Sequence, residues 1–204
     1  MTQTKTEKSG LQVLNSLPVK RHAAFDVPRI TSLWGALGEI TLPGDYAEFG
    51  VFRGVAARRI LAFMTGQRKM HLFDSFEGLP EDWTESKKAG AFKLGQGEVP
   101  KFDPKRTAVY KGWFKDTVPD FGKSMQAPLA FVHVDCDLYS STIDVLFNIN
   151  HLIVPGTILL FDEYAMGKED GEHRALCEWA EKFGREYEHL WRTEGPQVCT
   201  RITK

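Results

Sequence analysis

Short apolar runs alternate along the chain with stretches in which apolar residues recur every three or four positions. The short runs are rich in β-branched and aromatic residues, which is typical of strands, and the spaced stretches are typical of amphipathic helices. We therefore expect strands and helices to alternate through most of the sequence. The predicted strands lie at residues 45–49, 69–73, 107–112 and 127–135 and, after a turn, within 154–164, and the predicted helices lie at 26–40, 55–64, 141–152 and 172–184.

The alternation of strands and helices predicts an α/β fold, with a mostly parallel sheet that helices cover on both faces. Residues 186–193 and 197–203 look like a closing hairpin. We expect residues 1–40 to form an N-terminal segment with one short helix, whose first dozen residues are frayed, and residues 41–204 to form one domain. Residues 81–105 are polar, contain several glycines and show no period, so they predict a long loop or lid inside that domain.

Two of the predicted strands end in pairs of acidic residues. The segment VHVDCDLYSST carries Asp135 and Asp137 at the end of an apolar run, and TILLFDEY carries Asp162 and Glu163. Carboxylates are costly to desolvate unless they are paired or bound to a metal. Because ligands of open α/β sheets bind beyond the carboxyl ends of the strands, we expect these acids to share one edge and to hold a hard divalent cation such as Mg²⁺. The alternative is that they are solvent-exposed loop acids or helix caps.

A glycine-containing turn follows the first predicted strand of the domain. The segment Glu48-Phe-Gly50-Val-Phe-Arg-Gly54 leads from a strand into a helix, where glycine lets the backbone approach a ligand and free amide groups face it. The spacing is not that of the dinucleotide motif GxGxxG, and an ordinary strand-to-helix turn explains it equally well. Asp74 ends the next predicted strand, the usual place of an acid that binds ribose hydroxyls, although it could also cap a helix. Together these features indicate a ligand with a ribose and an amino-acid-like or phosphate end.

Composition excludes several classes of function. The chain has 204 residues, of which 42% are hydrophobic and 26% are charged, an ordinary globular composition. Its formal net charge of -1 provides no field that attracts nucleic acid or an anionic membrane, so we expect neither as a partner. We expect a cytoplasmic location, because no apolar stretch reaches the length of a membrane span, the N-terminus has no apolar signal segment, and the three cysteines form no CxxC pair.

Five segments, in this order, resemble the macrocin O-methyltransferase (TylF) family over roughly residues 40–200: DYAEFGVFRGVAARRI, FDSFEGLPE, KGWFKDTVP, VDCDLYSST and PGTILLFDEY. The resemblance implies a Rossmann-like class I methyltransferase, with a mostly parallel seven-stranded sheet and a C-terminal antiparallel hairpin. It implies S-adenosylmethionine as methyl donor, assistance by Mg²⁺ or a similar divalent cation, and a small-molecule acceptor that presents a sugar hydroxyl. A homo-oligomer is compatible with this class.

The resemblance also implies roles for individual residues. Asp137 matches the acid placed as general base, and Asp135, Asp162 and Glu163 match metal ligands. Where the family usually has a second aspartate, this chain has Glu163. The remaining matches surround the cofactor: Glu48, Gly50 and Gly54 near the methionine part, Asp74 at the ribose with Ser75 and Phe76 beside the adenosine, and Gly112, Trp113 and Phe114 near the adenine. Val51 and Asp135 are also expected to bind the cofactor.

Other functions remain open from the sequence. A catechol-type O-methyltransferase would use the same cofactor and metal and differ only in the acceptor. A methyltransferase-like domain without activity would bind the cofactor and show no metal dependence. A nucleotide- or NAD-dependent α/β protein is disfavoured, because the chain lacks GxGxxG. The chain is also shorter than typical family members, in the N-terminal segment and the lid that shape the acceptor pocket.

Overall fold

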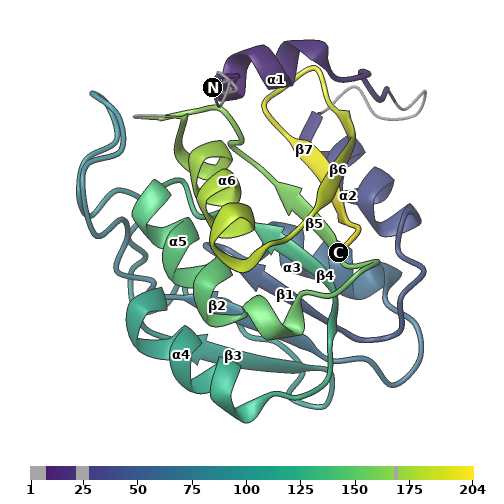
Figure 1. Cartoon of the computed structure of the whole chain (residues 1–204). Helices are drawn as coiled ribbons and strands as arrows, with labels where there is room; N and C mark the ends of the chain where they lie inside the picture. Colours follow the sequence, from purple (N-terminus) through teal and green to yellow (C-terminus); the bar gives the residue numbers. More distant parts are fainter. Residues whose placement is uncertain (1–7, 22–27, 168–169) are drawn as a thin grey trace.

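A computed structural model describes residues 8–21, 28–167 and 170–204, and within them the chain folds around one seven-stranded sheet (Figure 1). The strand order is β3-β2-β1-β4-β5-β7-β6. β7 runs antiparallel to both of its neighbours, and the other pairs are parallel. The strands are β1 (Asp45–Phe49), β2 (Met70–Asp74), β3 (Thr107–Lys111), β4 (Leu129–Val134), β5 (Ile158–Phe161), β6 (Tyr187–Arg192) and β7 (Val198–Ile202).

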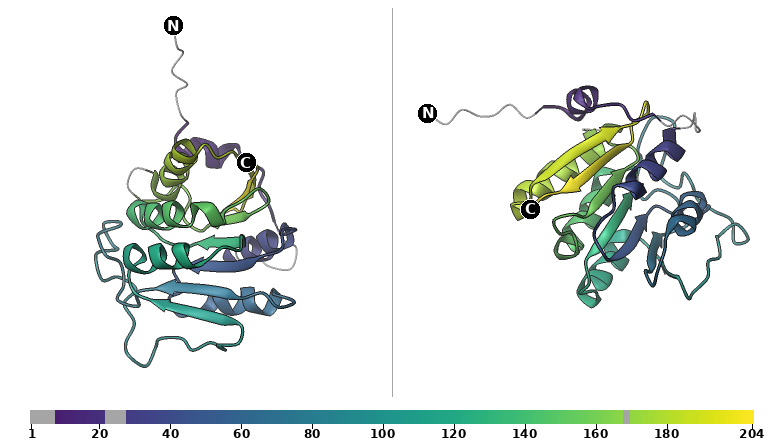
Figure 2. Two further views of the ribbon diagram at one scale, coloured as in Figure 1. Left: turned by 60° about the horizontal axis from the view of Figure 1, so that its bottom comes forward. Right: turned by 90° about the vertical axis from the view of Figure 1, so that its right-hand side faces the viewer.

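Helices cover both faces of this sheet, as the turned views show (Figure 2). One core joins the sheet to α4, α5 and α6, through side chains such as Phe121, Leu146 and Trp179. The other joins the opposite face to α2 and α3, through Leu37 and Ile60. The helices are α1 (Gly10–Ser16), α2 (Pro28–Gly38), α3 (Val55–Phe63), α4 (Phe114–Ser124), α5 (Tyr139–Asn148) and α6 (Gly171–Phe183), with a short 3₁₀ turn, η1 (Asn150–Leu152), after α5.

The direction in which the chain winds reverses between β1 and β4. From β1 the chain moves outward to β2 and β3, and it then returns to add β4 and β5 on the other side of β1. In open α/β sheets a ligand crevice forms at such a reversal, beyond the carboxyl ends of the strands. β4 lies at the centre of the sheet, where every residue in it is buried. Its run of mostly apolar residues suits this position.

The predicted fold is confirmed, with differences near the N-terminus and after β3. The expectation of a frayed first dozen residues is wrong for the described part, because α1 begins at Gly10. Ser9 and Gln12 form a capping box at its start, and the Gly10 amide donates to Asp170 Oδ2 at 2.7 Å. Sequence reasoning also missed α4, whose apolar positions bracket Pro119. Residues 1–7, part of the predicted N-terminal segment, lie outside the described residues, and the division at residue 40 stays a prediction.

The long stretch between β2 and β3 contains no helix or strand in residues 81–105, as predicted. Main-chain hydrogen bonds across its turns fix the path of this stretch. The Leu79 amide donates to the Ala91 carbonyl at 2.8 Å, and the Trp83 amide donates to the Lys87 carbonyl at 2.9 Å. Among the helices that the structure describes, none is both long and apolar enough to span a membrane.

A chain of buried and partly buried polar groups ties the closing hairpin to the rest of the domain. The Tyr164 hydroxyl lies 2.8 Å from His189 Nε2 and 2.7 Å from His173 Nδ1. His189 Nδ1 in turn lies 2.8 Å from Thr200 Oγ1. Burial, together with the nearby His173, lowers the pKa of His189 to about 4. The fold therefore holds His189 in its neutral form.

Acid should weaken the fold through this histidine. Between pH 6.5 and 4 the unfolded chain protonates His189 and the folded protein does not, so the free energy of unfolding falls as the pH falls, by about 3 kcal/mol at most. Glutamine at position 189 can keep a contact with Tyr164 but does not titrate. Between pH 7 and pH 4.5 we therefore expect the free energy of unfolding to fall by about 2 kcal/mol less in His189→Gln than in the wild type. Urea unfolding at both pH values measures the difference, and equal losses in the two proteins would refute the assignment.

Candidate active site

Two backbone segments cross closely where the sheet reverses. Gly50 follows β1 with φ +98°, and its amide donates to the Phe73 carbonyl at 3.0 Å. The Asp135 amide, just after β4, donates to the Phe49 carbonyl at 2.9 Å. A Cβ atom on Gly50 would lie 1.8 Å from the Asp135 carbonyl oxygen, so only glycine allows this approach. The predicted glycine turn and the first acidic pair therefore meet at the same point of the sheet.

Asp74 organises the glycine turn. Its Oδ2 accepts hydrogen bonds from the amides of Val51 and Phe52, at 2.9 and 2.7 Å, and its Oδ1 accepts one from the Phe76 amide at 2.6 Å. A carboxylate has about four acceptor positions, so Asp74 keeps capacity for one more donor. Asp74 is thus a structural residue of the turn, and its contact with ribose stays a prediction.

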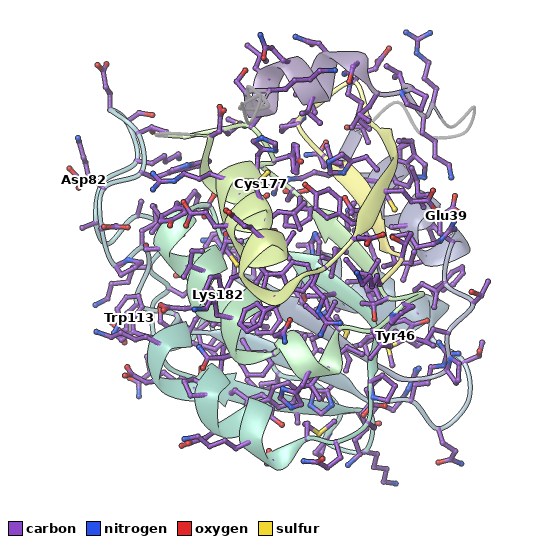
Figure 3. All side chains as sticks on the ribbon, in the orientation of Figure 1. Glu39, Tyr46, Asp82, Trp113, Cys177 and Lys182 are labelled. Carbon is purple, nitrogen blue, oxygen red and sulfur yellow. The ribbon has the colours of Figure 1, made fainter. Side chains whose placement is uncertain are left out.

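A cavity of about 490 Å³ opens at this edge and touches most of the predicted site residues. Figure 3 shows Trp113 on the side toward which the parallel strands point, and Tyr46, near the start of β1, on the other. The cavity is lined by the predicted site residues Gly50, Asp74, Ser75, Gly112, Trp113, Phe114, Asp135 and Asp137. The predicted residues outside that lining are Glu48, Val51, Gly54, Phe76, Asp162 and Glu163.

Glu48 lies inside the sheet, although sequence reasoning placed it at the cofactor. Its side chain is fully buried, and Oε1 lies 3.1 Å from Nδ1 of the buried His133 on β4. Burial raises the pKa of Glu48. Burial lowers the pKa of His133, but the hydrogen bond and charge of Glu48, together with the charges of Asp135 and Asp162, outweigh it and the net shift is upward. Glu48 and His133 therefore form a polar pair beneath the glycine turn.

Four acidic side chains from the ends of β4 and β5 gather beside the cavity. Asp135, Asp137 and Glu163 each place a carboxylate oxygen within 4.8 Å of the others. Asp137 lies in a left-handed conformation with φ +61°, in the loop after β4. Asp162 and Glu163 are almost fully buried, at 2% and 5% exposure. The expectation that both strand ends contribute acids to one edge is met by this geometry.

Two residues that sequence reasoning missed complete the cluster. Arg29, in the first turn of α2, places Nη2 against Asp162 Oδ2, at 2.6 Å from Glu163 Oε1 and 3.6 Å from Asp135 Oδ1. Glu172, in the first turn of α6, is fully buried, and its Oε2 accepts from the Glu163 amide at 3.1 Å. An acid in the first turn of an amphipathic helix usually faces solvent near the helix dipole, so the sequence carried no sign that Glu172 is buried.

The carboxylates repel one another. Burial and then Asp162 raise the pKa of Asp135 to about 8. Burial raises the pKa of Asp137 to about 7, against the opposing effect of Arg29. Burial opposes the charge of Arg29 as well, but the acids around it hold its pKa above the ordinary value. One guanidinium thus does not compensate the full charge of the cluster.

The donor set fits a hard divalent cation. All the nearby donors are carboxylate oxygens, the ligands that Mg²⁺ and Mn²⁺ prefer. Glu163 Oε2 and Glu172 Oε1 are buried and have no hydrogen-bond partner among the described residues. Orphaned buried carboxylate oxygens are costly, and a bound cation would satisfy them.

The loop between β2 and β3 closes over the glycine turn. Phe92 packs edge-on against Phe52 with ring centroids 5.8 Å apart, and both rings line the cavity. Glu98 forms an ion pair with Arg53 at 2.7 Å. On the acid side, Ser140 donates to Glu81 Oε1 at 2.5 Å. The loop therefore forms one wall of the cavity, with contacts to the acidic side near its start and to the glycine turn near its end.

The chain is similar in sequence to O-methyltransferases. The sequence profile described as macrocin-O-methyltransferase (TylF) matches residues 29–182. The 8-demethyl-8-(2,3-dimethoxy-alpha-L-rhamnosyl)-tetracenomycin-C 4'-O-methyltransferase of Streptomyces olivaceus is 30% identical over 145 residues, which are 61% of this chain and 54% of that protein. The demethyldecarbamoylnovobiocin O-methyltransferase of Streptomyces niveus is 31% identical over 176 residues, 73% of this chain and 64% of that protein. This chain thus spans less than two thirds of the length of either relative.

Solved structures show the same fold. The O-methyltransferase NovP superposes with a TM-score of 0.70 at 25% identity, over 91% of this chain and 84% of that chain. The calicheamicin methyltransferase CalS11 gives a TM-score of 0.69 at 22% identity, over 98% of this chain and 87% of that chain. The seven-stranded sheet with its antiparallel hairpin is therefore the class I methyltransferase fold.

The close backbone crossing at Gly50 can be tested by substitution. Gly50→Ala must move the Asp135 carbonyl, whereas Gly66→Ala has a similar positive φ of +74° and nothing within 4 Å of the added Cβ. Both substitutions carry the strain of a left-handed alanine, about 1–2 kcal/mol. We expect Gly50→Ala to cost at least about 2 kcal/mol more in urea unfolding. Equal losses would contradict the steric argument.

Proposed function

Because the chain belongs to the macrocin O-methyltransferase (TylF) family, we propose that it transfers a methyl group from S-adenosylmethionine to a hydroxyl of a sugar on a natural product. The observation that carries the proposal is the shared edge of the sheet. The glycine turn and the acidic cluster lie at the reversal between β1 and β4, and Gly50, Asp74, Asp135 and Asp137 line one cavity. A donor bound at the turn would lie beside an acceptor bound at the acids.

The cofactor side is built from the turn and from two strand ends. Gly50 would admit the methionine part, since no side chain obstructs the backbone there. Trp113 and Phe114 line the cavity at the start of α4 and would contact the adenine, while Asp74 retains one acceptor position for a ribose hydroxyl. When bound, S-adenosylmethionine supplies an already activated methyl group. The protein then needs to position the acceptor and take up its proton.

The acceptor side depends on the acidic cluster. Asp135 and Glu163 would hold a divalent cation, with Asp137 close enough to share in its binding. Asp162, which contacts the same Arg29 nitrogen as Glu163, would be a further ligand. Such a cation supplies Lewis acidity, which lowers the pKa of an acceptor hydroxyl. Asp137 lines the cavity beside Asp135 and Glu163, so its carboxylate lies where it could accept the proton of a hydroxyl bound there. We assign it the role of general base.

The sugar assignment is supported by the relatives. The name of the Streptomyces olivaceus relative specifies a rhamnosyl group, and a Micromonospora griseorubida relative, at 29% identity, is a mycinamicin III 3''-O-methyltransferase. A catechol-type acceptor would use the same donor and acids. The loop at residues 81–105, as a lid, would exclude water from either acceptor.

Ligand binding separates this proposal from a nucleotide-dependent function. We expect S-adenosylhomocysteine to bind the purified chain in isothermal titration calorimetry, and NAD and ATP not to bind, because the turn carries the methyltransferase spacing and lacks GxGxxG. Binding of NAD or ATP with no response to S-adenosylhomocysteine would exclude the proposed donor.

Substitution of the base tests the chemistry. Asp137→Asn keeps the shape of the side chain but removes its capacity to take up a proton, so we expect turnover to fall by about 10²–10⁴-fold while affinity for S-adenosylhomocysteine remains. Methyl transfer from labelled S-adenosylmethionine to a panel of rhamnosides measures turnover. Asp120→Asn, on the exposed surface of α4, is the matched control. Normal turnover in Asp137→Asn would remove this residue from the mechanism.

A further inference from the structure

Arg29 places a single nitrogen among the residues proposed as metal ligands. Its Nη2 contacts Asp162 Oδ2 and lies 2.6 Å from Glu163 Oε1 and 3.6 Å from Asp135 Oδ1. These oxygens come from the ends of two different strands, so the nitrogen occupies the point where β4 and β5 direct their carboxylates. The Arg29 side chain also lines the cavity.

A guanidinium and a divalent cation exclude each other at this point. Mg²⁺ binds carboxylate oxygens at about 2.0–2.1 Å, so an ion held by the same oxygens would occupy the volume of Nη2. Arginine stays protonated at any working pH, and two positive charges in contact repel strongly. Binding of the ion therefore requires the Arg29 side chain to leave the cluster.

The fold allows Arg29 to move without moving the body of its helix. Arg29 lies in the first turn of α2, and its side chain is more than half exposed. One and two turns further on, Leu33 and Leu37 are buried in the core against the sheet. The Ser32 hydroxyl donates to the Arg29 carbonyl at 2.9 Å and is the local contact that would adjust.

We infer that Arg29 is an internal competitor of the metal: its guanidinium balances the acids until a divalent cation displaces it and releases the first turn of α2 at the rim of the cavity. This inference rests on the metal site in the proposed function. It makes the N-terminal segment responsive to metal, because the residue that leaves the cluster belongs to α2. It also means that the wild-type chain binds metal more weakly than its carboxylates alone would.

The direct test compares Arg29→Met with Arg21→Met. Methionine keeps an unbranched stem and offers no oxygen ligand, unlike glutamine. Arg21 is a matched control in the same part of the chain, because it is exposed and pairs with Glu194 at 2.7 Å, away from the cluster. We expect Arg29→Met to bind Mn²⁺ about tenfold more tightly than the wild type and Arg21→Met to match the wild type. Electron paramagnetic resonance of free Mn²⁺ measures the affinities.

Hydrogen exchange gives a second readout, which reports on the first turn of α2 and not on metal affinity. Mg²⁺ should increase amide exchange at Ser32 and Leu33, whose amides bond back to the first turn of α2, and should leave it unchanged in Arg29→Met. If the wild type and Arg29→Met bind Mn²⁺ equally, or Arg29→Met binds more weakly, competition is refuted and the metal site stands. If neither binds Mn²⁺, the inference and the metal part of the proposed function both fail, while S-adenosylhomocysteine binding still tests the donor.

Discussion

The charge balance at the reversal between β1 and β4 is the constraint on which the site depends. The fold brings acids from the ends of β4 and β5, and Glu172 from α6, into a small partly buried volume. Carboxylates so placed raise one another's pKa values and need a cation. Arg29 supplies one positive charge from α2, at the point where a divalent ion held by the same carboxylates would lie. The proposed methyl transfer depends on whether the Arg29 guanidinium or a divalent metal ion occupies that volume.

The acids are attached to strand ends that the sheet fixes in place, whereas Arg29 is attached to the first turn of α2, where its side chain can move. Asp135 is fixed through its backbone, which crosses the β1 turn where only Gly50 fits. Asp162 follows a strand that is buried along its whole length. Arg29 reaches the same point from the end of a helix on one face of the sheet, and Glu172 reaches it from a helix on the other. Strand ends therefore hold the acids in place, and a helix terminus carries the group that can leave.

Sequence reasoning predicted what depends on local pattern and missed what depends on tertiary placement. The strands, the closing hairpin and the two acidic pairs carry strong periodic or positional signals. α4 gave a weak signal because Pro119 interrupts its pattern. Glu48 lies one residue before the end of β1, and its pairing with His133 on β4, inside the sheet, follows only from the strand order. Its role at the cofactor stays a prediction. Arg29 and Glu172 looked like ordinary charged residues of helix first turns, because nothing local shows that those turns end at the acids.

Which cation the acidic cluster holds is measured most directly by a crystal structure of the chain with S-adenosylhomocysteine and Mn²⁺, with anomalous scattering recorded for the metal. We expect one Mn²⁺ peak bound by oxygens of Asp135 and Glu163, with S-adenosylhomocysteine in the 490 Å³ cavity and the Arg29 guanidinium outside the cluster. A structure with S-adenosylhomocysteine in the cavity and the Arg29 guanidinium still among the acids, without a metal peak at saturating Mn²⁺, would contradict it.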